Sequence, residues 1–246
     1  SGLPWCPVLS PAQPRVRRLT GRIRCRVGAF FVRKKDGMLR LVLDARWANQ
    51  LYVRPPTTRL AVPSSLARLS ASEAAVAFAE CELLGRDPHF EPGCGLLGYS
   101  VDLTDGFYQF KSETMASLFG LGVSVTWGEA KRLFPFLSSD ELFDDDAGFA
   151  TPIDDDIVME AAFLGMCMGW SWSLHFCNEC IADAMRRALL HRDLPPVLVG
   201  DRQRGPFLSG SAPVMAPYVD NVNMIALGRE RGNQLFDDVL TELRDK

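Results

Sequence analysis

Two apolar runs joined by a short polar turn predict a β-hairpin near the start of the chain. The runs cover residues 27–32 and 38–43, and residues 34–37 form the turn between them. Gly37 is the turn residue best suited to positive φ. We therefore expect two antiparallel strands with a tight connection.

A second hairpin is predicted near the end of the chain. The apolar runs 214–216 and 224–227 flank residues 218–221, whose sequence is Tyr-Val-Asp-Asn. The polar pair Asp220-Asn221 tolerates positive φ, so we expect the turn to be centred on it. This prediction places one carboxylate at the hairpin tip. Such pairs are most often simple turns, and the tip becomes a candidate site only beside a second carboxylate.

That second carboxylate ends a predicted strand over residues 96–103. Alternation places Tyr99 and Val101 on one face of this strand, with Ser100 and Asp102 on the other. A carboxylate at the end of a strand is carried by a rigid element, which suits a metal site. The alternative is a solvated surface group.

Helical spacing of apolar residues predicts most of the remaining regular structure. In the longest stretch, Cys177, Ile181 and Ala188 recur along one side. The expected helices cover residues 64–84 with Ser64 as N-cap, about 107–119, a stretch that opens at 163–173 and runs to about 191, and 233–243.

The composition indicates a globular protein. Of the 246 residues 47% are hydrophobic and 23% are charged, which excludes a disordered chain. No apolar run is long enough for a membrane span, and the first residues do not resemble a signal peptide. The seven cysteines have irregular spacing, which predicts reduced thiols in an intracellular protein of the cytoplasm or nucleus. The chain does not begin with Met, so we expect a piece of a longer protein.

The charge is distributed unevenly. Residues 1–60 contain thirteen Arg or Lys against two acids, a local charge of +11, so the remainder carries −14 of the total of −3. A basic end on an acidic body favours contact with a polyanion or phosphate, and a solvated basic face is the alternative. Lys34, Lys35 and Arg40 gather on the first hairpin, where three cations could hold a triphosphate. The alternative is an exposed polar hairpin that binds no phosphate, because it would carry the same residues.

Two other clusters of potential metal ligands are weaker. Residues 136–160 carry nine acids and no Lys or Arg, but consecutive Asp residues lack the spacing of a calcium loop, so we expect an acidic surface insertion. His175, Cys177 and Cys180 lack a second pair of ligands at zinc-finger spacing.

Taken in order, four motifs resemble those of the reverse transcriptases of retroelements. They span about residues 27 to 243, and four motifs in the family's order are more specific than any one of them. The motifs are the fingers motif Lys34-Lys35-Asp36-Gly37-x-x-Arg40 running into Asp44-x-Arg46-x-x-Asn49, the palm motif around Ser100-Val101-Asp102, the stretch Met168-Gly169 to Ser173 with Asn178 further on, and the tip Tyr218-Val219-Asp220-Asn221.

The resemblance implies an α+β fold, the fingers and palm of a right-handed polymerase, in which the palm is an antiparallel sheet backed by helices. It also implies a thumb and a ribonuclease H region beyond the palm, so we expect the rest of a polyprotein outside these 246 residues. The expected segments are an irregular basic arm at 1–26, fingers at 27–97, palm with the first catalytic Asp at 98–122, fingers with the acidic insertion at 123–165, and palm at 166–246.

The implied reaction is template-directed addition of deoxynucleotides to a primer 3′-hydroxyl. In such chemistry two Mg²⁺ ions about 3.5–4 Å apart, or Mn²⁺ in their place, activate the hydroxyl and stabilise the phosphate charge. The resemblance makes Asp102 and Asp220 the catalytic metal ligands and Asn221 a weak one. The implied partners are deoxynucleoside triphosphates and a primed RNA or DNA template. Nucleotide-binding residues would be Lys34, Lys35, Arg40, Phe107 and Gly169, and template or primer support would come from Asp44, Arg46 and Tyr218.

The sequence departs from the family pattern at three positions. Asn221 stands where the family has a second Asp, Met168 where it has Gln, and Leu174 where Pro is common. A decayed relic that keeps the fold and nucleic-acid binding is therefore the alternative to an active enzyme. An RNA-dependent RNA polymerase is a third possibility, which would carry a small residue or Asp in place of Phe107.

Overall fold

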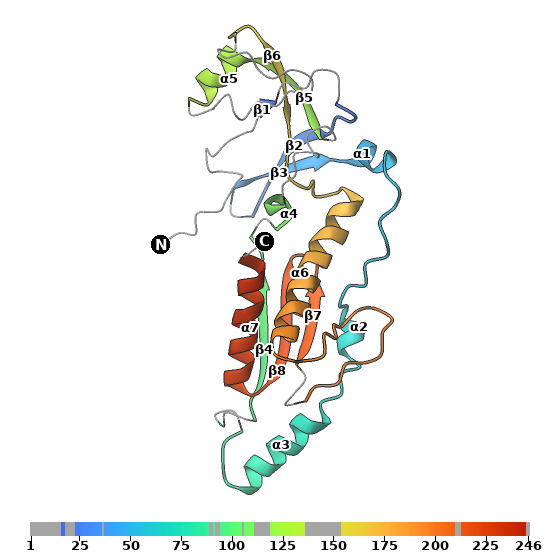
Figure 1. Cartoon of the computed structure of the whole chain (residues 1–246), viewed down its shortest axis with the longest axis vertical. Coiled ribbons are helices and arrows are strands. Elements are labelled where there is room, and N and C mark those ends of the chain that lie inside the picture. The colour runs from blue at the N-terminus through green and yellow to red at the C-terminus, as the bar shows by residue number, and fades with distance from the viewer. Residues whose placement is uncertain are drawn as a thin grey trace. The chain divides into compact units, whose positions relative to one another are not determined.

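The computed structural model describes residues 16–17, 23–35, 37–88, 91, 94–104, 106–110, 119–135, 154–209 and 213–244. Helices and strands are mixed along the chain, which opens with three strands and then three helices (Figure 1). The strands are β1 (Val16–Arg17), β2 (Gly28–Arg33), β3 (Leu39–Asp44), β4 (Leu96–Asp102), β5 (Gly120–Thr126), β6 (Val158–Ala162), β7 (Val214–Tyr218) and β8 (Asn221–Leu227). The helices are α1 (Arg46–Gln50), α2 (Pro63–Leu66), α3 (Ser72–Leu83), α4 (Gly106–Gln109), α5 (Trp127–Leu133), α6 (Ser171–His191) and α7 (Arg229–Arg244).

The strands form antiparallel sheets with the orders β1-β6-β5, β2-β3 and β4-β8-β7. The protein is thus a mixed α and β structure with antiparallel sheets, compatible with the predicted α+β class. Within the described ranges, no helix is both long and apolar enough to cross a membrane.

The chain divides into two compact units, which we describe separately. The first unit consists of residues 1–55 and 104–174, and the second of residues 56–103 and 175–246. The assignment of segments to fingers and palm stays a prediction.

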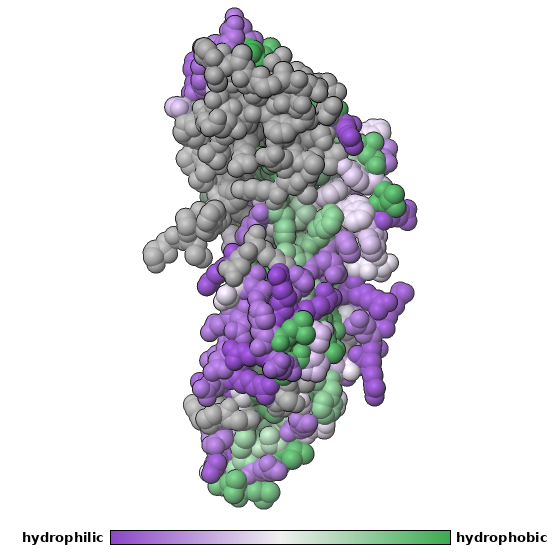
Figure 2. All heavy atoms as spheres, viewed as in Figure 1, coloured by the Kyte–Doolittle hydropathy of each residue, from purple (hydrophilic) through white to green (hydrophobic). Residues whose placement is uncertain are grey.

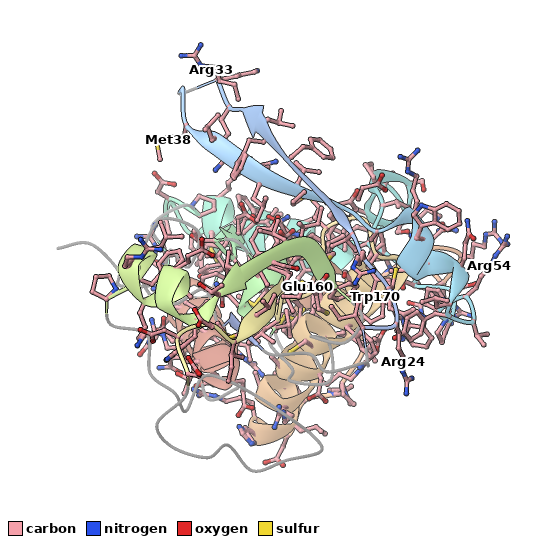
Figure 3. The ribbon with its side chains drawn as sticks, turned by 90° about the horizontal axis from the view of Figure 1, so that it is seen from above. Arg24, Arg33, Met38, Arg54, Glu160 and Trp170 are labelled. Atoms are coloured by element: carbon pink, nitrogen blue, oxygen red, sulfur yellow. A yellow bond between two sulfur atoms is a disulfide. The ribbon has the colours of Figure 1, made fainter. Side chains whose placement is uncertain are left out.

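In the first unit, the predicted basic hairpin is confirmed. Strands β2 and β3 pair from Gly28 with Asp44 to Arg33 with Leu39, and Gly37 has a φ of 85°. Figure 3 shows Arg33 and Met38 at the far end of this hairpin. Its base is anchored by the buried Leu43, whereas Phe31 is 65% exposed.

The rest of the first unit is organised around β5, β6 and α5. Thr126 caps α5 in a capping box with Glu129, which satisfies backbone donors at the helix start. Trp127 and Met159 join α5 and β6 in a small apolar cluster. Of the expected acidic insertion, residues 154–156 form an exposed turn, and residues 136–153 lie outside the described part.

In the second unit, helices α6 and α7 cover one face of the sheet β4-β8-β7 (Figure 1). The core joins Ile181 and Met185 of α6 to Val222 of β8 and to Leu235 and Val239 of α7, all at most 2% exposed. Both helices and their buried faces were predicted from apolar spacing. Hydrophilic residues cover the outer side of α7 in Figure 2.

The helix α7 begins four residues earlier than predicted, at Arg229. Gly232 lies in this first part of the helix, where a Cβ would stand 2.5 Å from the Tyr99 hydroxyl oxygen. The glycine thus permits close packing of the helix on β4 and does not mark the helix start.

The prediction of one helix over residues 64–84 is wrong. Helix α2 ends at Leu66 and α3 begins at Ser72. The break occurs because Ser70 pairs with a distant segment: its N–H donates to the carbonyl of Pro206 and its carbonyl accepts from the N–H of Leu208, both at 2.9 Å. Ser64 lies inside α2 and does not cap it, since the N-cap position is Val62.

Of the predicted helix at 107–119, only α4 is helical, and it ends at Gln109. Phe110 and Phe119 are not helical, because their carbonyls accept the N–H groups of Met166 and Phe163, and residues 111–118 lie outside the described ranges.

The prediction that all cysteines are reduced is wrong for one pair. Cys81 of α3 and Cys94, which precedes β4, form a disulfide across 13 positions of sequence. Cys25, Cys167, Cys177 and Cys180 are free thiols. Irregular spacing in sequence therefore did not show which thiols are neighbours in space. Cys6 lies outside the described residues.

Candidate active site

Asp102 is the last residue of β4 and lies on the exposed face of the strand. The burial of β4 alternates along its whole length, and Ser100 and Asp102 are exposed as predicted. Asp102 stands opposite Asn221 in the antiparallel register. A carboxylate at this point is held by a strand paired along its length.

The tip of the second hairpin differs from the prediction. Tyr218 pairs with Asn221, so the two-residue loop consists of Val219 and Asp220, and Asn221 is the first residue of β8. Val219 has a φ of 57°, whereas Asp220 does not have a positive φ. Positive φ at the first loop residue alone is the pattern of a type II′ turn, where glycine is usual. A β-branched residue in this conformation is strained.

The loop nevertheless brings Asp220 to the same end of the sheet as Asp102. The N–H of Leu103, which follows Asp102, donates to the carbonyl oxygen of Asp220 at 3.0 Å. Burial raises the pKa of the half-buried Asp220 carboxyl, a bond to its own backbone lowers it, and the charge of Asp102 raises it further. A like charge nearby disfavours ionisation, so Asp102 adds to the effect of burial on Asp220.

Asn221 lies beside this pair. Its side-chain amide donates to Oδ1 of Asp220 at 3.3 Å. An aspartate at this position could not make that bond, because an ionised carboxylate only accepts. Asn221 therefore neutralises part of the acceptor capacity of Asp220, and its own carbonyl oxygen is a weaker metal ligand than a carboxylate.

Polar side chains occupy two neighbouring cross-strand rows on the face of the sheet that carries Asp102. Tyr218, Asn221 and Asp102 are in register across the three strands, and Tyr218 is 42% exposed. In the next row, Ser100 donates to Oδ1 of Asn223 at 2.9 Å, and the Asn223 amide donates to the carbonyl of Ala216 at 3.3 Å.

Two residues on α6 lie beneath the tip. Oδ1 of Asn178 accepts the N–H of Val219 at 3.1 Å, and Asn178 is 2% exposed. The buried thiol of Cys177 has a pKa raised to about 12, first by burial and then by the charge of Asp220. Asn178 belonged to a predicted motif but was not assigned to the site. An amide within an otherwise apolar helical stripe was the signal that could have identified it.

The predicted nucleotide-binding cations belong to the first unit. Lys34, Lys35 and Arg40 are exposed on the β2-β3 hairpin, and Asp36 of the turn lies outside the described residues. Phe107 is half-buried on α4.

Two of the three predicted template or primer residues, Asp44 and Arg46, bind each other. The Arg46 guanidinium donates to both carboxylate oxygens of Asp44, and these bonds lower the pKa of Asp44. The side chain of Arg46 is 87% exposed. Asp44 thus orients Arg46 at the start of α1.

Gly169 and α6 are joined to α1 by one amide. The Asn49 side chain donates to the carbonyl of Gly169 at 2.9 Å and accepts from the N–H of Ser171 at 2.8 Å. Gly169 has a φ of 108°, which favours glycine. The conformation of the chain entering α6 therefore depends on Asn49.

The two carboxylates fit a hard divalent cation, because such ions prefer oxygen ligands. Within the described residues, no group of three or more His, Cys, Asp or Glu side chains could hold a metal. Mg²⁺ usually binds through one or two carboxylates together with waters and substrate phosphates. Asp102 and Asp220 would supply the protein's share of such a site.

No known protein-family model matches this chain, and no curated protein has a significantly similar sequence.

Proposed function

We propose that this chain is a reverse transcriptase-like domain that adds deoxynucleotides to a primer 3′-hydroxyl on a template. Asp102 and Asp220 would be its metal ligands, and the fold would be the fingers and palm of a right-handed polymerase. The proposal comes from the motif resemblance.

One observation carries the proposal furthest. Asp102 and Asp220 are 118 positions apart in sequence, yet both lie at one end of the sheet β4-β8-β7, where burial and then the charge of Asp102 raise the pKa of Asp220. A fold gains no stability from this repulsion. Retaining two such groups is understandable if a cation binds between them.

The chemistry explains the residue types. Bound divalent ions would lower the pKa of the primer hydroxyl and stabilise charge on the phosphates. The carboxylates of Asp102 and Asp220 would orient those ions, and the half-buried setting of Asp220 would limit competition from water. Lys34, Lys35 and Arg40, exposed on the hairpin of the first unit, are of the kind that binds phosphate oxygens through charge-assisted bonds.

Primer extension tests the proposal. The chain, Asp102→Ala and Asn221→Asp are incubated with an RNA template, a DNA primer, the four deoxynucleotides and Mg²⁺ or Mn²⁺. We expect extension by the native chain and none by Asp102→Ala. If neither incorporates a nucleotide while Asn221→Asp does, the native sequence is not an active enzyme.

A second candidate function is nucleic-acid binding without turnover by a decayed relic. The bond from the Asn221 amide to Oδ1 of Asp220 favours it, because that contact competes with a metal for the same oxygen. Under this reading, the native chain binds a labelled primer-template in a salt-dependent manner but extends nothing. Gain of extension by Asn221→Asp would identify the decayed site.

A further inference from the structure

The loop Val219-Asp220 adopts a conformation that its own sequence disfavours. Val219 has a φ of 57°, and the left-handed region costs an L-residue about 1–2 kcal/mol. The branched Cβ of valine makes this worse. A contact from elsewhere in the fold must therefore stabilise the loop.

Asn178 supplies such a contact. It lies on α6, next to the fully buried Cys177 and one turn before the fully buried Ile181, and is itself 2% exposed. An amide inside a helix and away from water is unfavourable unless it is hydrogen-bonded. Its Oδ1 accepts the N–H of Val219 at 3.1 Å.

The loop is held at both of its ends. At its start the N–H of Val219 bonds to Asn178, and at its end the carbonyl of Asp220 accepts the N–H of Leu103 at 3.0 Å. The peptide units on either side of the pair are thus fixed, one by α6 and one by the chain that leaves Asp102. The direction of the Asp220 side chain follows from the backbone between them.

We propose that Asn178 is a positioning residue that holds Val219 at positive φ and so directs the carboxylate of Asp220 toward Asp102. The effect of Asn178 on metal binding rests on the proposed function, whereas its effect on the conformation of Val219 is independent of that function.

The test uses the whole chain and Mn²⁺ alone, with free Mn²⁺ followed by electron paramagnetic resonance. Asn178→Leu keeps a side chain of similar size but removes the acceptor. We expect its Mn²⁺ dissociation constant to rise about tenfold, the upper end for loss of one hydrogen bond. A crystal structure of the variant should show Val219 outside the positive-φ region.

The matched control is Ser65→Ala. Ser65 is also 2% exposed, and its Oγ donates to the carbonyl of Gly200 at 3.2 Å in the same unit. This variant loses a buried hydrogen bond away from the tip, so it should become less stable without a change in Mn²⁺ affinity. Equal loss of affinity in both variants would mean that Asn178 acts only on general stability, and would overturn the inference.

The double variant Asn178→Leu/Val219→Gly gives a rescue. Glycine adopts positive φ without strain, so the loop no longer needs the bond, and most of the lost affinity should return. No recovery in a folded double variant contradicts the inference. So does an Asn178→Leu structure that retains positive φ at Val219 with unchanged affinity.

Two further outcomes are decided by the native chain. If Asn178→Leu does not fold, amide hydrogen exchange of Val219 in the native chain takes the place of the measurement on the variant. Protection of this amide supports the inference, and exchange as fast as in an unfolded chain overturns it. If the native chain binds no Mn²⁺ and extends no primer, the proposed function fails. The φ of Val219 in Asn178→Leu then still decides whether Asn178 holds the loop.

Discussion

Burial, and then the negative charge of Asp102, raises the pKa of Asp220 at the end of one sheet. The two residues come from a strand end and a hairpin loop, and their proximity follows from the pairing of Asp102 with Asn221. Without a cation, the ionised pair is a source of instability in the folded protein.

Replacing Asp220 with Asn should stabilise the metal-free protein at neutral pH. Because burial and Asp102 raise the folded-state pKa of Asp220, ionisation disfavours the folded state as the pH rises from the unfolded pKa, about 3.9, through the folded one. Below both values the carboxyl is neutral in both states and the gain should vanish. Urea unfolding of both proteins at pH 3.5 and pH 8 measures this, and an equal difference at the two pH values contradicts it.

Replacing Val219 with Gly should raise the free energy of unfolding by about 1 kcal/mol. Glycine removes the strain of the positive φ, and its greater flexibility in the unfolded chain offsets part of this gain. Urea unfolding checks this. Val219→Ala is the control, because alanine keeps a Cβ and should recover less. A less stable glycine variant would show that the valine side chain contributes more than its backbone strain costs.

Replacing Gly232 with Ala should destabilise the protein by about 1–3 kcal/mol, as is usual for overpacking. The new Cβ would meet the Tyr99 hydroxyl, which is itself held by a 2.8 Å bond to Oδ1 of Asn233. Gly98→Ala on the same strand as Tyr99 is the matched control, since its Cβ would meet nothing within 4 Å. Equal effects of the two changes in thermal unfolding would contradict the packing of α7 on β4.

Reducing the disulfide Cys81–Cys94 should lower the melting temperature. The bond closes a loop with a sequence separation of 13, and loops of this size contribute about 3 kcal/mol by restricting the unfolded chain. The double variant Cys81→Ser/Cys94→Ser should match the reduced protein and no longer respond to reductant. A native protein whose melting temperature ignores reductant would contradict this assignment.

Local patterns predicted the parts of the fold that depend on local chemistry. Alternation identified β4 and the exposed position of Asp102, and apolar spacing identified the buried faces of α6 and α7. The two hairpins were recognised because polar turns separate apolar runs.

The failures have a common physical cause, which is contact between distant residues. Ser70 breaks a helix-favouring stretch because its backbone pairs with residues 206 and 208. The turn moved from Asp220-Asn221 to Val219-Asp220, where Asn178 stabilises a conformation that valine disfavours. The Cys81–Cys94 disulfide likewise depends on a proximity that spacing does not encode.

The amide of Asn49 also has a consequence for the order of folding. It completes the entry to α6 from 120 residues away in sequence. Contacts of such high sequence separation form slowly, because a long loop must close before they contribute. During synthesis, Asn49 leaves the ribosome long before Gly169 does. We therefore expect the first turn of α6 to be among the last parts of its unit to acquire native structure, and its backbone amides to gain protection late in refolding.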